Sequence, residues 1–359
     1  MKTDELSMFL DSVDRFMKTE MAPYTATMDL YPQKDLPFNI FDKFTKAGIL
    51  NREGVDGELL NPGNSVRLLS ALSCHCAGIG AFVGYALAGE MLKKRYAPGQ
   101  LPGGPVGICL HEEVDVDIEH CMPDFRTKLE GGAVHGAKKS VIMAGCATVY
   151  AVFASAGDGL CLAWVDGRAG TVEVSQPVGL LGIRAVPCAD ISFRAAPAIG
   201  KAEAGPEALL YVAAVLGLFN AACACATADT GLRKAWEYAA QRYQGGRTIG
   251  DYDAVELMYA RNATMVGSSR EAILAAADGF EDRSQERLQA CIRAKINGSG
   301  NAVNALLDAI QMHGGYGYMR DYGIEKRFRD AVALSLMPFD NTRLSLMLAG
   351  TEARERRRI

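Results

Sequence analysis

The 359-residue sequence lacks a strong excess of charge of either sign, and it lacks a long, uninterrupted apolar run. A net charge of −4 gives no general attraction to nucleic acid or to anionic lipid. The most apolar stretch, residues 208–228, is rich in Ala and Cys and contains Asn220, which favours a buried core helix over a membrane span. The sequence also has no internal repeat and no low-complexity segment. We therefore expect neither nucleic-acid binding nor a membrane span.

The ten cysteines form no metal or disulfide framework. In Cys74-His75-Cys76 and Cys223-Ala224-Cys225 the thiols are closer in sequence than the ligand pairs of zinc sites, and no second pair completes a site. Both pairs lie in small apolar runs, where a free cysteine acts as a small hydrophobic residue. In the absence of a signal peptide, this cysteine content favours reduced thiols and a cytoplasmic location. No metal site is expected.

The periodicity of apolar residues predicts a multi-domain α+β fold in three parts. Residues 1–104 read as a helical domain, because Phe9, Val13 and Phe16 recur at helical spacing. Residues 105–198 contain short β-branched and aromatic runs separated by Gly and Asp, which predicts a small β-sandwich or barrel. The helical period returns in residues 199–359, predicted as a four-helix bundle. The predicted strands are 106–110, 134–135, 141–143, 149–153, 160–164, 171–174 and 191–193.

The first candidate site is the segment 238–250, Tyr-Ala-Ala-Gln-Arg-Tyr-Gln-Gly-Gly-Arg-Thr-Ile-Gly, at the end of a long helical pattern. It places Arg242 and Gln244 before a glycine pair. A guanidinium group matches phosphate oxygens bidentately, and a glycine-rich turn exposes backbone N–H groups. The alternative interpretation is a surface arginine followed by glycines that end a helix.

The second candidate site is the segment 311–320, Gln-Met-His-Gly-Gly-Tyr-Gly-Tyr-Met-Arg. Gln311 precedes Gly314, Gly315 and Gly317, and glycine is needed where a ligand approaches the backbone closely. The helix that follows can direct N–H groups at a phosphate. A left-handed turn between packed helices is the alternative. His313 is interpreted as a packing residue without a catalytic role.

Together with the helix–sheet–helix order, these segments resemble the acyl-CoA dehydrogenase family, flavoenzymes that desaturate acyl thioesters. The resemblance is strong over residues 238–349 and fair over 131–193. It implies an oligomer, an acyl-CoA substrate and an electron-transfer flavoprotein as electron acceptor. It also implies a set of residues that bind the pyrophosphate and ADP part of an FAD held mainly by a neighbouring subunit: Arg242, Gln244, Gln311, Gly314, Gly315 and Gly317.

The central region departs from the family pattern. Where the family has a run that binds flavin and thioester, residues 110–117 lack its Gly-Ser pair, and five carboxylates lie within 112–119, where they should repel a pyrophosphate. Ser140 and Ile142 replace the Trp and Thr that flank the flavin ring in the family, and Val186 and Cys188 replace polar residues. The sequence thus keeps groups suited to a neighbour's flavin and loses those suited to its own.

The catalytic base of the family is also missing. Desaturation needs a carboxylate that removes the α-proton of the thioester. Counting without a gap from Arg329-Asp330-Ala331 places the family's glutamate at Pro338. A shift of two residues would align Asp340 instead, although its shorter side chain would misplace the base. The position that some members use on the long helix falls near Leu216.

Three functions follow as alternatives. The first is a non-catalytic subunit that completes the FAD site of a glutamate-bearing paralogue in a hetero-oligomer. The second is an active homo-oligomeric acyl-CoA or acyl-carrier-protein dehydrogenase with Asp340 as its base. The third is a flavin-dependent monooxygenase on the same fold, which would need no such base. A structural protein without flavin contact is the remaining alternative, and the sequence does not specify an acyl substrate.

Overall fold

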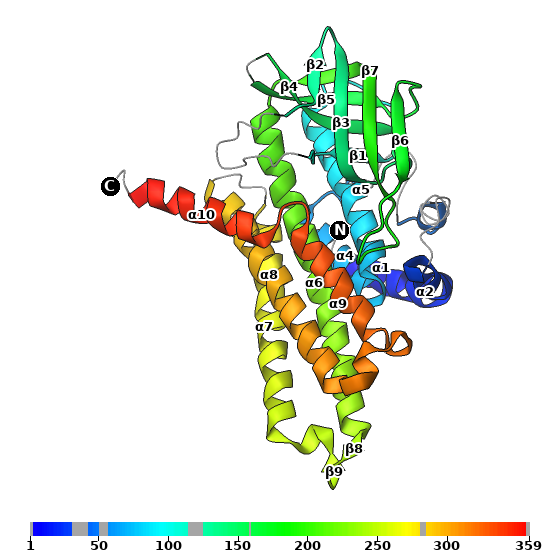
Figure 1. Ribbon diagram of the computed structural model, residues 1–359, viewed down its shortest axis with the longest axis vertical. Helices are drawn as coiled ribbons and strands as arrows, with labels where there is room; N and C mark the ends of the chain where they lie inside the picture. Colours follow the sequence, from blue (N-terminus) through cyan, green and yellow to red (C-terminus); the bar gives the residue numbers. More distant parts are fainter. Residues whose placement is uncertain are drawn as a thin grey trace.

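The structure is a computed structural model that describes residues 3–30, 42–49, 57–113, 125–157, 159–280 and 285–356. Helices come first along the chain, a sheet follows, and long helices complete the fold (Figure 1). The sheet lies at one end of the molecule, and the long helices extend away from it.

The N-terminal helices pack around apolar side chains that recur at helical spacing. They are α1 (Thr3–Phe16), the π-helical turn η1 (Met17–Met21), α2 (Ala22–Leu30), α4 (Pro62–His75) and α5 (Ala77–Tyr96). In α4, Asn61 caps the N-terminus by accepting a hydrogen bond from the Asn64 amide, and Pro62 occupies the first turn, where it costs no hydrogen bond. Gly80 of α5 has no room for a Cβ, which would meet the Ser73 hydroxyl and the Cys223 sulfur, so α5 packs closely against α4 and α6.

The sheet contains seven strands, and its pairing closes on itself. The strands are β1 (Val106–Cys109), β2 (Lys128–Glu130), β3 (Ala133–Ile142), β4 (Val149–Ala156), β5 (Gly159–Asp166), β6 (Val172–Pro177) and β7 (Cys188–Ala202). Pairing runs β4–β2–β3–β7–β5 and returns from β5 to β4, with β1 added beside β4 and β6 beside β7. Trp164, Tyr150 and Phe153 fill the interior and the contact with the helices. The predicted runs fall on these strands, but two of them, 134–135 and 141–143, fall on the single strand β3, and β2 was not predicted.

The C-terminal part consists of long helices with a small hairpin. The elements are α6 (Gly205–Gln241), β8 (Tyr243–Gln244), β9 (Arg247–Thr248), the 3-10 turn η2 (Ile249–Asp251), α7 (Asp253–Asp278), α8 (Gln285–His313), the 3-10 turns η3 (Gly314–Tyr318) and η4 (Arg320–Tyr322), α9 (Ile324–Leu336) and α10 (Asn341–Arg356). The helix α6 is long and apolar enough to cross a membrane by length and composition, but 89% of its most apolar window is buried inside the structure. The prediction of a buried core helix is therefore confirmed.

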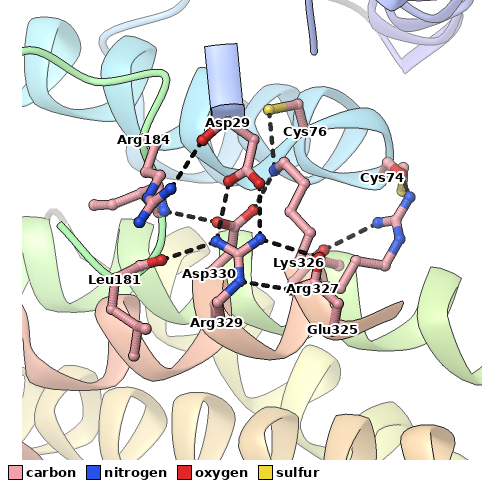
Figure 2. Close-up of polar contacts among 12 residues, drawn as sticks. Asp29, Cys74, Cys76, Leu181, Arg184, Glu325, Lys326, Arg327, Arg329 and Asp330 are labelled. Carbon is pink, nitrogen blue, oxygen red and sulfur yellow. Dashed lines mark hydrogen bonds and ion pairs between the residues drawn. The ribbon is translucent and has the colours of Figure 1, made fainter. Parts of the chain in front are cut away.

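A polar network joins the start of the chain, the segment 180–187 and α9 (Figure 2). Asp330 is 1% exposed and accepts hydrogen bonds from the Ile183 amide and from Lys326 Nζ, each at 2.6 Å. Arg329 forms a bidentate ion pair with Asp29, with N–O distances of 3.1 and 2.7 Å. Although burial opposes the charge of Lys326, the Asp330 carboxylate raises the pKa of this lysine. The network fixes α9 against the end of the sheet.

Candidate functional site

A cavity of about 340 Å³ lies where α6 ends and α8 meets η3, and we call it the hairpin cavity because β8 forms part of its wall. Its lining residues are Tyr238, Arg242, Gln244, Ile249, Gln311, Met312, His313, Gly314, Gly315, Tyr316 and Met319. Five of the predicted site residues therefore meet around one space, although they come from segments about 70 positions apart in the sequence. Gly317 is not among the lining residues.

Glycine is required for different structural reasons at the two ends of the motif 314–317. A Cβ added at Gly314 or Gly315 would meet nothing within 4 Å, so open space lies beside this backbone. Gly314 also has a φ of +58°, which glycine adopts at little cost. In contrast, Gly317 is buried, and a Cβ there would lie 2.5 Å from the carbonyl oxygen of Ile310. The close approach at Gly317 is thus made by the chain itself.

Aromatic side chains form one wall of the hairpin cavity. Tyr238 stacks on His313 with ring centroids 4.6 Å apart and an interplanar angle of 18°. Tyr316 is 45% exposed, and the Arg242 guanidinium lies 5.9 Å from the centroid of its ring. Burial lowers the pKa of His313, whose Nδ1 lies 2.8 Å from the Ala309 carbonyl oxygen, so it is neutral at pH 7 and has a packing role. The sequence motifs gave no indication of this wall, because it forms only when two distant segments meet.

The hairpin holds Arg242 and Gln244 at the rim of the cavity. Gly245 and Gly246 have φ values of +66° and +93°, which a tight two-residue hairpin turn requires. The Tyr252 hydroxyl donates to the carbonyl oxygens of Gln244 and Gly245 and so holds the turn in place. Arg242 is exposed and has no carboxylate partner within the described residues. Its guanidinium is therefore available to an anion.

A second cavity, of about 210 Å³, lies between the sheet and α9, and we call it the barrel cavity. Its lining is mostly aliphatic: Tyr85, Ile108, Leu110, His111, Lys139, Ser140, Val141, Ile142, Leu180, Leu181, Ile183, Cys188, Val332, Ala333, Leu336 and Met337. Ser140 and Ile142, which the resemblance aligns with residues that flank the flavin ring, both line it. Ser140 and Ile183 have φ values of +50° and +49°, in the left-handed region that non-glycine residues seldom adopt.

The polar groups of the barrel cavity are largely engaged with protein partners. Lys139 Nζ lies 2.9 Å from Asp190 Oδ2, and the Asp190 carboxylate also accepts from the Ser140 amide. Burial raises the pKa of the Tyr85 hydroxyl, which lies near the side chain of Asn220. Burial raises the pKa of the Cys188 thiol to about 12, so that thiol is neutral. Among the described residues that line this cavity there is no Asp or Glu.

The structure gives Glu112, the first carboxylate of the acidic segment 112–119, a role other than the repulsion of a pyrophosphate that the sequence indicated. This carboxylate points inward, where Lys138 Nζ lies 2.7 Å away and the amides of Arg126 and Thr127 donate to it. Burial opposes the charge of Glu112, but Lys138 holds its pKa below the usual range, while burial lowers the pKa of Lys138 to about 8. The expected repulsion of a pyrophosphate therefore does not arise from Glu112. Asp115, Asp117 and Glu119 lie outside the described residues.

The candidate base Asp340, and the two positions aligned with the family's glutamate, lie outside the lining of the barrel cavity. Asp340 caps the N-terminus of α10, where its Oδ1 accepts from the Arg343 amide at 3.0 Å. Pro338 is buried next to Met337, and Leu216 is fully buried in α6. The neighbouring Met337 carbonyl accepts from Asn220 Nδ2, which ties this connection to α6. The structure thus brings the predicted phosphate-binding residues together but does not place Asp340 at either cavity.

The comparisons with known proteins agree with the fold. Residues 216–337 match the family model of the acyl-CoA dehydrogenase C-terminal domain. The chain is 26% identical to an acyl-CoA dehydrogenase of Bacillus subtilis (strain 168), over 92% of this chain and 93% of that protein. It is similar to a chain in the solved structure of the electron transferring flavoprotein of Acidaminococcus fermentans, with a TM-score of 0.87, 20% identity and 99% of both chains covered.

A second similar solved structure is that of an acyl-CoA dehydrogenase complexed with FAD from Bacillus anthracis, with a TM-score of 0.84 and 17% identity. The match covers 99% of this chain and 68% of that one. The structural comparisons show the fold of the acyl-CoA dehydrogenases. Residues 216–337 carry the C-terminal domain of the acyl-CoA dehydrogenase family, and the comparisons together support membership of this family, whose members are FAD enzymes.

The two cavities differ in how well they fit parts of FAD. The hairpin cavity offers the Arg242 guanidinium, which has no carboxylate partner among the described residues, together with open glycine backbone and an exposed tyrosine ring. These groups suit a pyrophosphate and an adenosine. The barrel cavity is smaller than the roughly 300–1,000 Å³ of common cofactor sites, and Ile142 offers no donor to a polar ring edge. The residues present fit the ADP part of FAD and do not fit its ring.

Proposed function

We propose that this chain is a non-catalytic subunit of a hetero-oligomeric acyl-CoA dehydrogenase. In this role Arg242, Gln244 and Gln311, with the backbone at Gly314 and Gly315, hold the ADP part of an FAD whose ring lies in a glutamate-bearing partner. FAD supplies the hydride-accepting chemistry when it is bound. The observation that carries the proposal is the contrast between the two cavities of this chain, one suited to the ADP part of FAD and one unsuited to its ring.

The distance between the cavities supports sharing of the cofactor. The barrel cavity lies beside α6 near Asn220, which contacts both Tyr85 and Met337 of its lining. The hairpin cavity lies at Tyr238 of the same helix. At about 1.5 Å per residue these positions are about 27 Å apart along α6. The two cavities are therefore well separated along α6, which supports the sharing of one cofactor between two chains.

Among the described residues that line the barrel cavity there is no carboxylate, which supports a non-catalytic role. A general base must reach the proton that it removes, within about 3 Å or through one water molecule. Among the described residues, the carboxylate offered by the sequence, Asp340, serves as a helix cap instead. We therefore propose that the base, like the ring site, belongs to the partner.

The proposal is tested by counting FAD per chain. The chain is purified alone and after co-expression with a glutamate-bearing paralogue, and bound FAD is measured by absorbance after denaturation. We expect no stoichiometric FAD on the lone chain and one FAD per heterodimer. One FAD per lone chain, bleached by acyl-CoA, would instead support an active homo-oligomer that uses Asp340. Oxygen consumption with reduced flavin would support a monooxygenase.

The role of Arg242 is tested within the heterodimer by an Arg242→Ala substitution. Charge-assisted hydrogen bonds contribute about 1.5–3 kcal/mol, so the FAD dissociation constant should rise about 10- to 100-fold. Arg247→Ala is the matched control, because Arg247 lies on the same hairpin but stacks on Tyr252, 4.0 Å from the ring centroid. Equal loss of FAD in both variants would show that the hairpin, and not the Arg242 guanidinium, matters.

By family resemblance, we propose an electron-transfer flavoprotein as the acceptor.

A further inference from the structure

A third cavity, of about 440 Å³, lies where α4 begins and α5 ends, and we call it the Arg95 cavity. Its walls come from the start of α4, the last two turns of α5, Tyr211 of α6 and Phe280, which follows α7. It shares no described lining residue with the hairpin cavity or the barrel cavity. Its volume falls within the roughly 300–1,000 Å³ of small-molecule sites, which combine an apolar lining with a few placed polar groups.

The described lining of the Arg95 cavity is positively charged. It contains Lys94 and Arg95 and no Asp or Glu. Glu207, outside this lining, balances the charge of Arg95 through an ion pair of 2.6 Å. Lys94 is exposed and has no carboxylate partner among the residues that the structure describes. One positive charge is therefore left for a ligand, which a monoanion would balance and a dianion would exceed.

The Arg95 guanidinium is held in place and is largely shielded from water. Its side chain is 18% exposed and lies between the rings of Tyr96 and Tyr211, at 5.0 and 5.2 Å from their centroids. The hydrogen bond to Glu207 uses Nη2, whereas Nε is buried and has no hydrogen-bond partner in the described part of the chain. Buried donors normally have a partner. A fixed guanidinium with unused donors is suited to a carboxylate, which it can bind bidentately.

Aromatic and aliphatic side chains form the rest of the wall. The rings of Tyr211 and Phe280 meet edge to face, with centroids 5.7 Å apart and an interplanar angle of 64°. Leu60 and Met91 add aliphatic surface beside them. Burial raises the pKa of the Tyr211 hydroxyl to about 12, so this ring carries no negative charge at pH 7. A further aromatic ring would gain both buried area and edge-to-face contacts here.

The walls of the Arg95 cavity are fixed before any ligand binds. Arg67 of α4 forms a bidentate ion pair with Asp278 at the end of α7, with N–O distances of 2.8 and 3.0 Å. The Arg95–Glu207 pair joins α5 to α6 in the same way. A preformed site spares the ligand the cost of ordering the protein. We infer that the Arg95 cavity binds a small monoanionic aromatic carboxylate, with its carboxylate at Lys94 and Arg95 and its ring against Tyr211 and Phe280.

The inference is tested on the full chain with phenylacetate as the probe, by calorimetry and by the rise in melting temperature that a bound ligand produces. We expect one saturable site. Acetate, which lacks the ring, and 2-phenylethanol, which lacks the charge, should each bind at least about tenfold more weakly. Equal affinity for phenylacetate and either of these compounds would overturn the inference. Tighter binding of phenyl phosphate, a dianion, would overturn the choice of a monoanionic carboxylate.

Substitutions at Lys94 locate the binding. Lys94→Glu should weaken phenylacetate binding at least about tenfold, whereas Lys94→Arg, which keeps the charge, should retain it. Lys128→Glu is the matched control, because Lys128 is an exposed lysine of β2 that lines none of the three cavities. Both lysines in the last turn of α5 also suit the helix dipole, so the melting temperature without ligand is measured to separate this structural effect. If Lys94→Glu is less stable, Lys94→Met removes the charge without repulsion.

Binding that is equally strong in the Lys94→Glu and Lys128→Glu variants would place the site elsewhere and refute the inference. The inference does not rest on the proposed function, because neither the probe nor the substitutions involve FAD. The FAD count in the heterodimer and the binding of phenylacetate can therefore fail separately.

Discussion

Replacing Asp330 by alanine should destabilise the protein strongly, because Asp330 is buried in α9 and joins this helix to the segment 180–187. The substitution leaves Lys326 Nζ and the Ile183 amide without their shared acceptor. Removing one partner of a buried ion pair costs about 3–5 kcal/mol. The Lys326 side chain keeps 20% exposure, so water can reach it and we expect the lower limit, about 3 kcal/mol. Asp330→Asn retains an oxygen for the Ile183 amide and should cost about 2 kcal/mol.

The assay is urea unfolding at pH 7 followed by circular dichroism. The control is Glu173→Ala, which removes an ion pair with Arg194 whose side chains are 49% and 73% exposed. Such an exposed pair contributes less than about 1 kcal/mol. If Asp330→Ala changes the free energy of unfolding no more than Glu173→Ala does, the network of Figure 2 does not fasten the sheet to α9.

Two further predictions concern glycine and lysine positions. Gly317→Ala should lower the melting temperature, because its Cβ would press on the Ile310 carbonyl. Gly315→Ala should fold normally and reduce only FAD retention in the proposed heterodimer. Equal melting temperatures of the two variants would contradict this prediction. Burial lowers the pKa of Lys295 to about 7, well below the 10.5 of an unfolded lysine. The unfolded chain then binds more protons between these pH values, so stability should rise with pH from about 7 to 10.5, by at most about 1.4 kcal/mol per pH unit. The prediction is checked by comparing the urea midpoints of the wild type and of Lys295→Met across this pH range. If the two midpoints change with pH in the same way, the lowered pKa of Lys295 is refuted.

The strands were predictable where apolar residues alternate or run together. The runs at 149–153 and 160–164 fall within β4 and β5, which are buried over most of their length. Strand β2 was missed because Lys128–Glu130 is short and polar, and pairing with β3 and β4 defines it. The two runs at the ends of β3 read as separate strands because exposed polar residues and a bulge lie between them.

The candidate site was predictable only where motifs are local. Arg242 and Gln311 were found because glycines mark each segment, and the structure brings both to the hairpin cavity. Tyr238 was missed as a wall of the cavity, because its stacking partner His313 lies on a different helix. Glu112 was misread because its buried partner, Lys138, lies on β3, 26 positions further along the chain. Pairing between distant residues leaves no mark in a single sequence.

The β8–β9 hairpin has a consequence for the kinetics of assembly. Its turn already has both glycines in the conformation it needs, and Tyr252 holds the carbonyl groups of the turn before any partner arrives. Little chain entropy remains to be lost on encounter. A heterodimer formed through this surface should therefore associate at the roughly 10⁵–10⁷ M⁻¹ s⁻¹ typical of rigid docking, without a slow folding phase.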